Sequence, residues 1–157
     1  MTYKLILRKA STSDANDIAN VYLTSRKKLV AFAPLVHSDE SVYQWICKDL
    51  LLNEHVIVAE ENKAIIGMMS LTKHEGIGRI RQLYILPSAV GHGIGSAMIK
   101  MAKSILGSPI QLYTFQENIG ARRFYERHGF LAIEFNDGSE NEENCPAVLY
   151  EWKMGNT

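Results

Sequence analysis

Three glycines, Gly91, Gly93 and Gly95, stand between an apolar segment that ends at Pro87 and a helical pattern that follows them. Glycine lets the backbone turn tightly and lets main-chain N–H groups come close to a ligand. The start of a helix adds unpaired N–H donors and the positive end of the helix dipole. The turn is therefore suited to bind an anion, and a phosphate or diphosphate is the natural candidate.

The spacing of these glycines does not fit two familiar phosphate-binding motifs. Gly95 is not followed directly by Lys and then Ser or Thr, as a Walker A loop requires. The dinucleotide-binding fingerprint places its third glycine one position later than Gly95. A simple glycine-rich corner between a strand and a helix remains the alternative explanation.

A second group of residues follows in the segment ENIGARRFYERHGF, residues 117–130. Asn118 and Tyr125 are seven residues apart in this segment, so a helix presents both on one face. Phe124 can fill the core beside them. The alternative for Tyr125 is a core aromatic residue whose hydroxyl reaches the surface.

The elements that position these motifs follow from hydrophobic periodicity and turn residues. Residues 3–9 are predicted as a strand, Ser11–Asp14 as the capped start of a helix, and Ser38 as the start of a second helix. The remaining predicted elements are a hairpin over 55–73 that turns at 61–63, a strand over 77–87, a helix from the glycine turn to Gly107, a strand over 110–115, a helix over 118–128, and strands near 130–136 and 146–153.

This order of elements predicts a mixed sheet flanked by helices. A doubly wound fold would need strict alternation of strands and helices from the start, which the sequence lacks. The chain has 157 residues, which suits one domain, residues 1–157, with one sizeable core.

Composition excludes several classes of function. The chain is 46% hydrophobic and 22% charged, and its 17 basic residues balance 17 acidic ones, which argues against a nucleic-acid binder. Cys47 and Cys145 form no CxxC pair and fit a reducing compartment, and no ligand cluster predicts a metal. No apolar run approaches the ~20 residues of a membrane span, and residues 1–10 make a poor signal peptide. We expect a soluble cytoplasmic protein with no metal, membrane or nucleic-acid partner.

The glycine turn and the segment 117–130 together resemble the GNAT superfamily of acetyl-CoA-dependent N-acetyltransferases, in its small bacterial form. A strand–GxGxG–helix unit is followed, in the same order, by a strand and the motif NxxAxxFYExxGF. The resemblance implies a GNAT fold of the α/β (α+β) class, with a mixed, mostly antiparallel sheet of about six to seven strands and about four flanking helices. It also implies an acyltransferase (EC 2.3.1 type) with acetyl-CoA as co-substrate.

The resemblance also implies where CoA binds. The amides of Gly91–Ser96 would hold the pyrophosphate, the main chain of Leu83 and Ile85 would pair with the pantetheine arm, and Asn118 would hydrogen-bond it. Val90 departs from the usual Arg or Gln, so a side-chain contact is missing there. The implied CoA-binding residues are Leu83, Ile85, Val90, Gly91, His92, Gly93, Ile94, Gly95, Ser96, Asn118 and Tyr125.

Transfer by direct attack through a tetrahedral intermediate needs a neutral amine, a donor for the oxyanion and a proton for the leaving thiolate. By the same resemblance, the N–H of Ile85 is the oxyanion donor and Tyr125 the general acid. The ordinary pKa of a tyrosine, about 10, lies near the ~8.5 of a free thiol.

The general base is the part that the sequence does not identify. Many family members carry a glutamate four residues before the position of Leu83, where this chain has Arg79, which cannot accept a proton. A water chain, or an amine that arrives neutral, would serve equally. The candidates by residue type alone are His37, His74, Glu60 and Glu75.

The acceptor side is predicted from the loops that border it in this fold. His37 precedes the second helix, and the acidic run 137–143 lies between the last two strands, where Glu142 and Glu143 would attract a cationic amine. A solvated loop is the alternative. The sequence thus predicts an N-acetyltransferase for a primary amine of a small cationic molecule.

Other functions stay open at this stage. They are acetylation of a protein lysine or N-terminus, a non-catalytic acyl-CoA sensor, and an α/β interaction domain. A homodimer is left open too, and the amine stays unnamed because specificity lies in variable loops.

Overall fold

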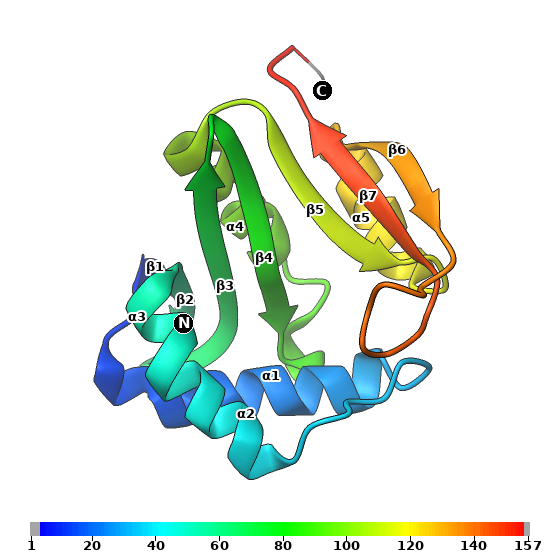
Figure 1. The fold of residues 1–157 in the computed structure, drawn as a ribbon. Helices are drawn as coiled ribbons and strands as arrows, with labels where there is room; N and C mark the ends of the chain where they lie inside the picture. Colours follow the sequence, from blue (N-terminus) through cyan, green and yellow to red (C-terminus); the bar gives the residue numbers. More distant parts are fainter. Residues whose placement is uncertain (1–3, 156–157) are drawn as a thin grey trace.

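The computed structural model describes residues 4–155, which form a seven-stranded sheet in the order β1-β2-β3-β4-β5-β7-β6 (Figure 1). Neighbouring strands are antiparallel except β4 and β5, which are parallel. The strands are β1 (Leu5–Lys9), β2 (His55–Glu61), β3 (Ala64–His74), β4 (Ile77–Ile85), β5 (Ile110–Phe115), β6 (Leu131–Asn136) and β7 (Ala147–Trp152). The predicted mixed, mostly antiparallel sheet is confirmed.

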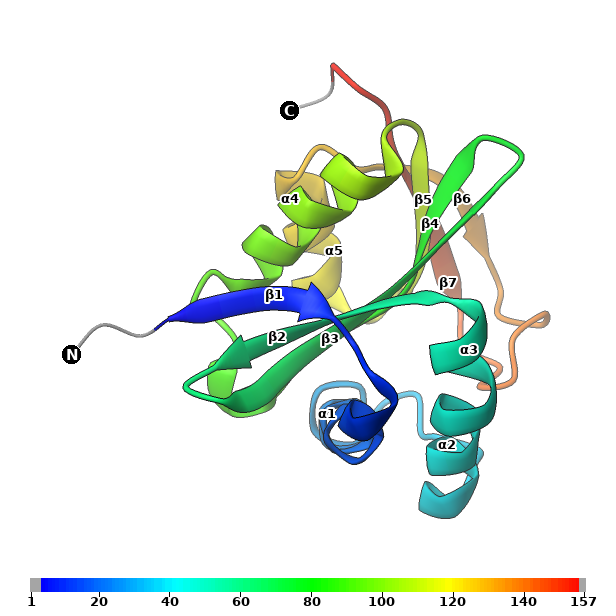
Figure 2. The ribbon, with the colours of Figure 1, turned by 90° about the vertical axis from the view of Figure 1, so that its left-hand side faces the viewer.

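Helices cover both faces of this sheet. They are α1 (Ala15–Leu29), α2 (Asp39–Trp45), α3 (Leu51–Asn53), α4 (Ile94–Leu106) and α5 (Ile119–Arg127). Figures 1 and 2 show α1, α2 and α3 on one face, and α4 and α5 on the other. None of the helices within residues 4–155 is long and apolar enough to cross a membrane.

Two hydrophobic clusters form the core, one on each face. Met69 of β3 joins the cluster under α4 and α5, whereas its neighbour Met68 joins the cluster under α1 and α2. Successive side chains of a strand point to opposite faces, so a central strand covered on both sides is apolar throughout. This explains the continuous apolar run of β3.

The second predicted helix is interrupted in the structure. Ser38 caps its start by accepting a hydrogen bond from the Ser41 N–H (3.1 Å). After α2, a π-helical turn over Ile46–Leu50 leads into α3, so the apolar stripe from Val42 to Leu50 remains buried although the helix is not one regular rod. Hydrophobic periodicity does not distinguish these helix types.

The start of α1 is held by an ion pair. The carboxylate of Asp14 accepts hydrogen bonds from the Arg8 guanidinium (2.8 Å) and from the Ser11 N–H (2.8 Å). The Arg8 hydrogen bond, as the largest cause, lowers the pKa of Asp14 to about 2. Because α1 carries residues that border the cleft described below, this contact helps to set the position of one wall.

We expect Asp14→Asn to lower the free energy of unfolding at pH 7 by about 1–2 kcal/mol, since Arg8 is partly exposed and water screens the pair. A depressed pKa stabilises the folded state fully above the ordinary value of 3.8. That stabilisation disappears as the pH falls through about 2. In urea unfolding, the difference in the free energy of unfolding between wild type and variant should therefore decrease as the pH is lowered. Asp17→Asn, at an exposed site in the same helix turn, is the control, and an equal loss there would contradict the prediction.

Strands β4 and β5 separate soon after they meet. Their parallel pairing comprises Gly78 with Ile110 and Arg79 with Gln111. Figure 1 shows the two strands diverging from this point. On its other edge β4 stays paired with β3 as far as Ile85, with a bulge where Ser70 faces Gln82 and the next residue, Leu71, faces Ile80. The divergence leaves one edge of β4 open.

Candidate active site

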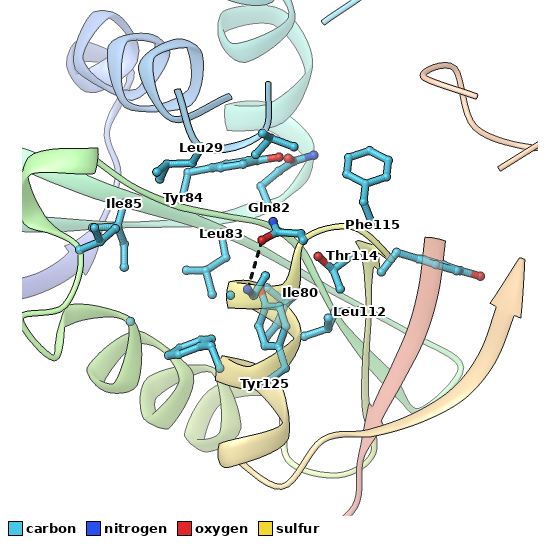
Figure 3. Close-up of a pocket in the computed structure, with 18 of the residues that line it drawn as sticks. Leu29, Ile80, Gln82, Leu83, Tyr84, Ile85, Leu112, Thr114, Phe115 and Tyr125 are labelled. Atoms are coloured by element: carbon cyan, nitrogen blue, oxygen red, sulfur yellow. Dashed lines mark hydrogen bonds between the residues drawn. The ribbon is translucent and has the colours of Figure 1, made fainter. Parts of the chain in front are cut away.

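A cleft of about 580 Å³ lies where β4 and β5 diverge. Its walls come from β4, β5, the glycine turn, the start of α5 and the end of α1 (Figure 3). The cleft therefore joins the two sequence motifs, which meet here although a strand and a helix separate them in the chain. Of the predicted CoA-binding residues, those that line it are Leu83, Ile85, Val90, Gly91, Gly93, Gly95, Ser96, Asn118 and Tyr125.

The bulge in β4 decides which side chains face α5. Strict alternation would place Ile80 on the same face as Gln82 and Tyr84. The extra residue, Arg81, shifts the alternation by one, so that Ile80 lies on the opposite face from Gln82. Ile80 and Leu83 accordingly lie on the side of Tyr125, and Tyr84 lies beside Leu29 on the side of α1 (Figure 3). Gln82 points toward the α1 side too.

The open edge of β4 presents the backbone of Leu83 and Ile85 to the cleft. The Leu86 N–H donates to the Ile66 carbonyl of β3 (2.8 Å). Backbone groups alternate between the two edges of a strand, so those of Ile85 and Leu83 face the other edge. The Ser25 hydroxyl already donates to the Ile85 carbonyl (2.9 Å), which ties α1 to this edge.

The glycine turn has the backbone that only glycine adopts readily. Gly91 has φ 84° and Gly93 has φ 80°, and no atom lies within 4 Å of where a Cβ would stand at either residue. The first backbone bond into α4 runs from the Ala97 N–H to the Gly93 carbonyl (3.1 Å). The N–H groups of the first helical turn thus remain for an external acceptor.

Gly95 serves a different purpose from the other two glycines. A Cβ there would lie 3.0 Å from the Phe124 ring and 3.3 Å from the Ile85 side chain, so Gly95 permits close packing of α4 against α5 and β4. Two residues of the predicted set do not line the cleft. Ile94 is buried, and His92 is exposed at the surface of the turn.

Asn118 begins α5 at the mouth of the cleft. Its Oδ1 accepts a hydrogen bond from the Ala121 N–H (3.2 Å), as an N-cap residue does. That bond fixes the side chain and leaves the amide nitrogen as a donor for a ligand. The same residue can thus start the helix and contact a bound molecule.

Tyr125 is buried in the core and also lines the cleft. Its ring packs on Phe124 (centroids 5.3 Å apart) and Phe130 (5.9 Å). Burial is the largest cause that raises the pKa of Tyr125 above its ordinary 10, and nearby Tyr84 raises it further. An ordinary pKa for Tyr125 was therefore the wrong expectation: its hydroxyl is a weaker acid and stays protonated at neutral pH.

A polar network outside the cleft anchors α5. The Tyr150 hydroxyl of β7 donates to the Glu126 carboxylate (2.6 Å) and accepts from Arg122 Nε (3.1 Å). These bonds hold the helix that carries Asn118 and Tyr125 against the sheet. Arg122 and Glu126 thus have structural partners within the protein.

A second cavity, of about 380 Å³, lies beside the cleft on the α1–α2 side. Gln82 lines both cavities. The rings of Tyr22 and Trp45 lie at its wall, with their centroids 5.4 Å apart. His37 Nε2 lies 2.8 Å from a Glu142 carboxylate oxygen. The structure thus brings together two predicted acceptor residues that lie far apart in sequence.

The third predicted acceptor residue, Glu143, is partly buried. Its carboxylate accepts from Arg26 Nη2 (3.1 Å), and the side chain of Arg26 is only 4% exposed. The guanidinium also donates to the Ala33 carbonyl (3.0 Å) and lies 5.6 Å from the Phe115 ring centroid. The acidic run contains no basic residue, but folding supplies Arg26 and His37 as partners.

The structure separates the four candidate bases. Glu60 pairs with Arg8 (3.2 Å), and His74 and Glu75 pair at the exposed β3–β4 turn (3.7 Å), away from the cleft. His37 alone among the four lines either of the two cavities described here. Arg79 lies in the paired part of β4. No group of His, Cys, Asp and Glu suited to a metal occurs within residues 4–155.

Several residues of the two cavities carry no signal in the sequence. Gln82 follows Arg81 in a strand whose residues 79–81 alternate between polar and apolar, and Arg26 is one of three consecutive basic residues at the end of a helix. Their positions depend on the bulge in β4 and on the loop between β6 and β7. Gln82 is an uncharged polar residue directly before the apolar run 83–86, and this is the feature that could have drawn attention to it.

Comparison with known proteins identifies the family of this chain. Residues 20–130 match the sequence model of the Acetyltransferase (GNAT) family. An uncharacterized N-acetyltransferase of Archaeoglobus fulgidus is 26% identical over 132 residues, which cover 76% of this chain and 88% of that protein.

Two solved structures share the fold. PaiA N-acetyltransferase from Thermoplasma acidophilum, in complex with coenzyme A, superposes with a TM-score of 0.76 at 21% identity over 96% of this chain and 99% of that chain. Ribosomal-protein-alanine N-acetyltransferase from Brucella melitensis has a TM-score of 0.73 at 15% identity over 95% and 99%. The match over most of the sequence places this chain in the acetyltransferase (GNAT) family, the acetyl-CoA-dependent N-acetyltransferases.

Proposed function

We propose that this protein transfers the acetyl group of acetyl-CoA to the primary amine of a small cationic molecule. The observation that carries the proposal is the open edge of β4, which faces a glycine turn and Tyr125 across one cleft. The coenzyme A bound by the Thermoplasma relative supports the choice of co-substrate. The proposal treats residues 1–157 as one cytoplasmic domain, in keeping with the free thiols of Cys47 and Cys145.

The residues of the cleft fit CoA by their chemistry. The amides of the glycine turn suit the diphosphate, and the backbone of Leu83 and Ile85 suits the amides of the pantetheine arm, as an added strand would. Asn118 supplies a further donor at the same end. The site accepts a ligand largely through the main chain, which explains why Val90 can stand where a polar side chain is usual.

The chemical roles follow from these positions. The Ile85 N–H is fixed by the strand and by the Ser25 bond to its carbonyl, so it is preorganised to stabilise the oxyanion of a tetrahedral intermediate. Tyr125, protonated at neutral pH, can donate its proton to the leaving thiolate. His37 lines the neighbouring cavity, which supports a proposed role for it in receiving the proton of the amine, directly or through water.

The acceptor class follows from the second cavity. Two aromatic rings and a carboxylate, those of Tyr22, Trp45 and Glu142, are groups that attract a cation. Gln82 connects this cavity to the cleft, so an amine held there would approach the end of the pantetheine arm.

A thiol-release assay with acetyl-CoA tests the activity. We expect turnover with small diamines and amino alcohols, and weaker turnover with uncharged amines of similar size. Faster turnover with lysine peptides or with free peptide N-termini would favour a protein acetyltransferase instead. Tight CoA binding without turnover over the whole panel would favour an acyl-CoA sensor.

We expect Gly93→Val to abolish the thermal stabilisation that CoA confers, because a branched side chain would obstruct the amides of the turn. In the wild type, CoA at 100 times its Kd should add about 2.7 kcal/mol to the stability. Gly76→Val is a matched control, since Gly76 has the same φ of 80° with no atom within 4 Å of its Cβ position. Both variants should lose some stability from backbone strain, but Gly76→Val should keep the full CoA response. An unchanged CoA response in Gly93→Val would show that the turn does not have its proposed role.

We expect Glu142→Gln to raise the KM for a cationic acceptor by more than it raises the KM for acetyl-CoA. The change removes one negative charge from the wall of the second cavity and keeps the shape of the side chain. Glu140→Gln, at an exposed position of the same loop, controls for a general loss of negative charge. Equal effects on both KM values, or the same rise in the acceptor KM for Glu140→Gln, would indicate that the loop is solvated and does not attract the acceptor.

A further inference from the structure

A histidine touches the proposed phosphate site from a neighbouring helix. His128, at the C-terminal end of α5, places its Nε2 3.0 Å from the hydroxyl oxygen of Ser96. Ser96 lies in the first turn of α4 and lines the cleft together with the glycine turn. The imidazole also packs against the Phe124 ring, with centroids 4.8 Å apart, so its position is fixed on two sides.

The charged groups around His128 are positive. From α4, Lys103 donates to the His128 carbonyl (2.6 Å), and from α5 Arg127 lines the cleft next to it. Burial first, and then these two cations, lower the pKa of His128 below its ordinary value. The imidazole is therefore mostly neutral at pH 7 in the free protein. Among residues 4–155, Ser96 is the polar contact of the ring.

A diphosphate at the glycine turn would reverse this balance. Its negative charges would come within a few ångströms of Ser96 and would favour the charged form of a nearby imidazole. The Ser96 hydroxyl can donate to only one acceptor. In the free protein it can donate to the neutral Nε2, whereas a phosphate oxygen would draw that proton toward itself and leave Nε2 to be protonated from solvent.

We propose that His128 is a positioning residue for the diphosphate of CoA and that binding is coupled to the uptake of a proton at its Nε2. The imidazolium then donates to the Ser96 oxygen, and the Ser96 hydroxyl donates to a phosphate oxygen. The inference rests on the proposed function, which places the diphosphate at this turn. Its consequence is that CoA binds more tightly at mildly acidic pH than at mildly alkaline pH.

Calorimetric titration with dephospho-CoA tests the coupling between pH 6.0 and pH 7.5. This probe keeps the diphosphate but lacks the 3′-phosphate, whose own second pKa of about 6 would otherwise contribute protons. Binding is measured in two buffers of different ionisation enthalpy, so that the number of protons taken up is obtained directly. We expect net uptake in the wild type and a Kd that rises by several fold across this range, up to about tenfold for one unit of pKa change.

Two variants assign the proton to a residue. His128→Asn should abolish the uptake and make the Kd nearly independent of pH, while still binding dephospho-CoA. His74→Asn should keep the uptake, because His74 is exposed at the β3–β4 turn and lines neither cavity. Uptake that persists in His128→Asn, or that disappears in His74→Asn alone, would overturn the assignment.

A measurement on the wild type guards against a folding defect in the variant. Imidazole resonances of His128, followed by NMR through the same pH range, should titrate at higher pH when dephospho-CoA is present. An unchanged titration in the bound protein would refute the proposal while leaving the acetyltransferase function intact. Failure of the wild type to bind both CoA and dephospho-CoA would instead refute the proposed function and the coupling with it.

Discussion

Tyr125→Phe is expected to lower kcat by about 10²–10⁴-fold with little change in the KM for acetyl-CoA. The substitution removes the proton donor and keeps the ring, whose packing on Phe124 and Phe130 is the structural part of its role. Within residues 4–155, this hydroxyl makes no hydrogen bond to another residue. Its loss should therefore leave the fold almost unaffected.

The pH dependence of kcat gives a second check on this residue. Because burial raises the pKa of Tyr125, the hydroxyl remains a donor through mildly alkaline pH. The kcat of the wild type should therefore stay constant between pH 8 and pH 9.5. A fall in kcat over this range that is absent from Tyr125→Phe would contradict a raised pKa for Tyr125.

Tyr150→Phe is the matched control for Tyr125→Phe. Both tyrosines pack against each other, with ring centroids 6.3 Å apart, but the Tyr150 hydroxyl bonds Glu126 and Arg122 outside the cleft. The control should lose stability and keep most of its kcat. A Tyr125→Phe variant with full kcat would show that this tyrosine is not the acid.

Glu143→Gln is expected to lower the free energy of unfolding by about 3 kcal/mol. The variant leaves the guanidinium of Arg26, which is 4% exposed, without its ion-pair partner. A charge buried in this way loses its hydration and is no longer compensated by an opposite charge. Because the carbonyl of a glutamine can still accept a hydrogen bond, a loss at the lower end of the range for broken buried pairs is expected.

Glu142→Gln is the comparison, since the neighbouring residue forms an exposed pair. The side chains of His37 and Glu142 are 51% and 55% exposed, and exposed pairs contribute about 0–1 kcal/mol. Denaturant unfolding should therefore show a larger loss of unfolding free energy for Glu143→Gln than for Glu142→Gln. Equal losses would contradict this division of roles within the loop.

The sequence alone determined the family, the order of elements and the position of the turn at the start of α4. These features are local: Gly91 and Gly93 are needed for a left-handed backbone, and Asn118 and Tyr125 share a face because two helical turns separate them. Hydrophobic periodicity is sufficient for β2, β3 and α4, since one or both faces of each element are buried. The amide cradle and the acid remain predictions that the proposed experiments test.

Only the tertiary structure decided which side chains meet. The bulge at Arg81 sets the phase of β4 and so turns Gln82 toward α1, and no periodicity of the sequence marks that extra residue. Glu142 and Glu143 are adjacent and chemically identical, yet one meets the exposed His37 and the other the buried Arg26. Burial likewise raises the pKa of Tyr125 and lowers that of His128, and it depends on neighbours contributed by distant segments. Contacts and dielectric surroundings of this kind arise from packing between elements, which the spacing of residues along one chain does not encode.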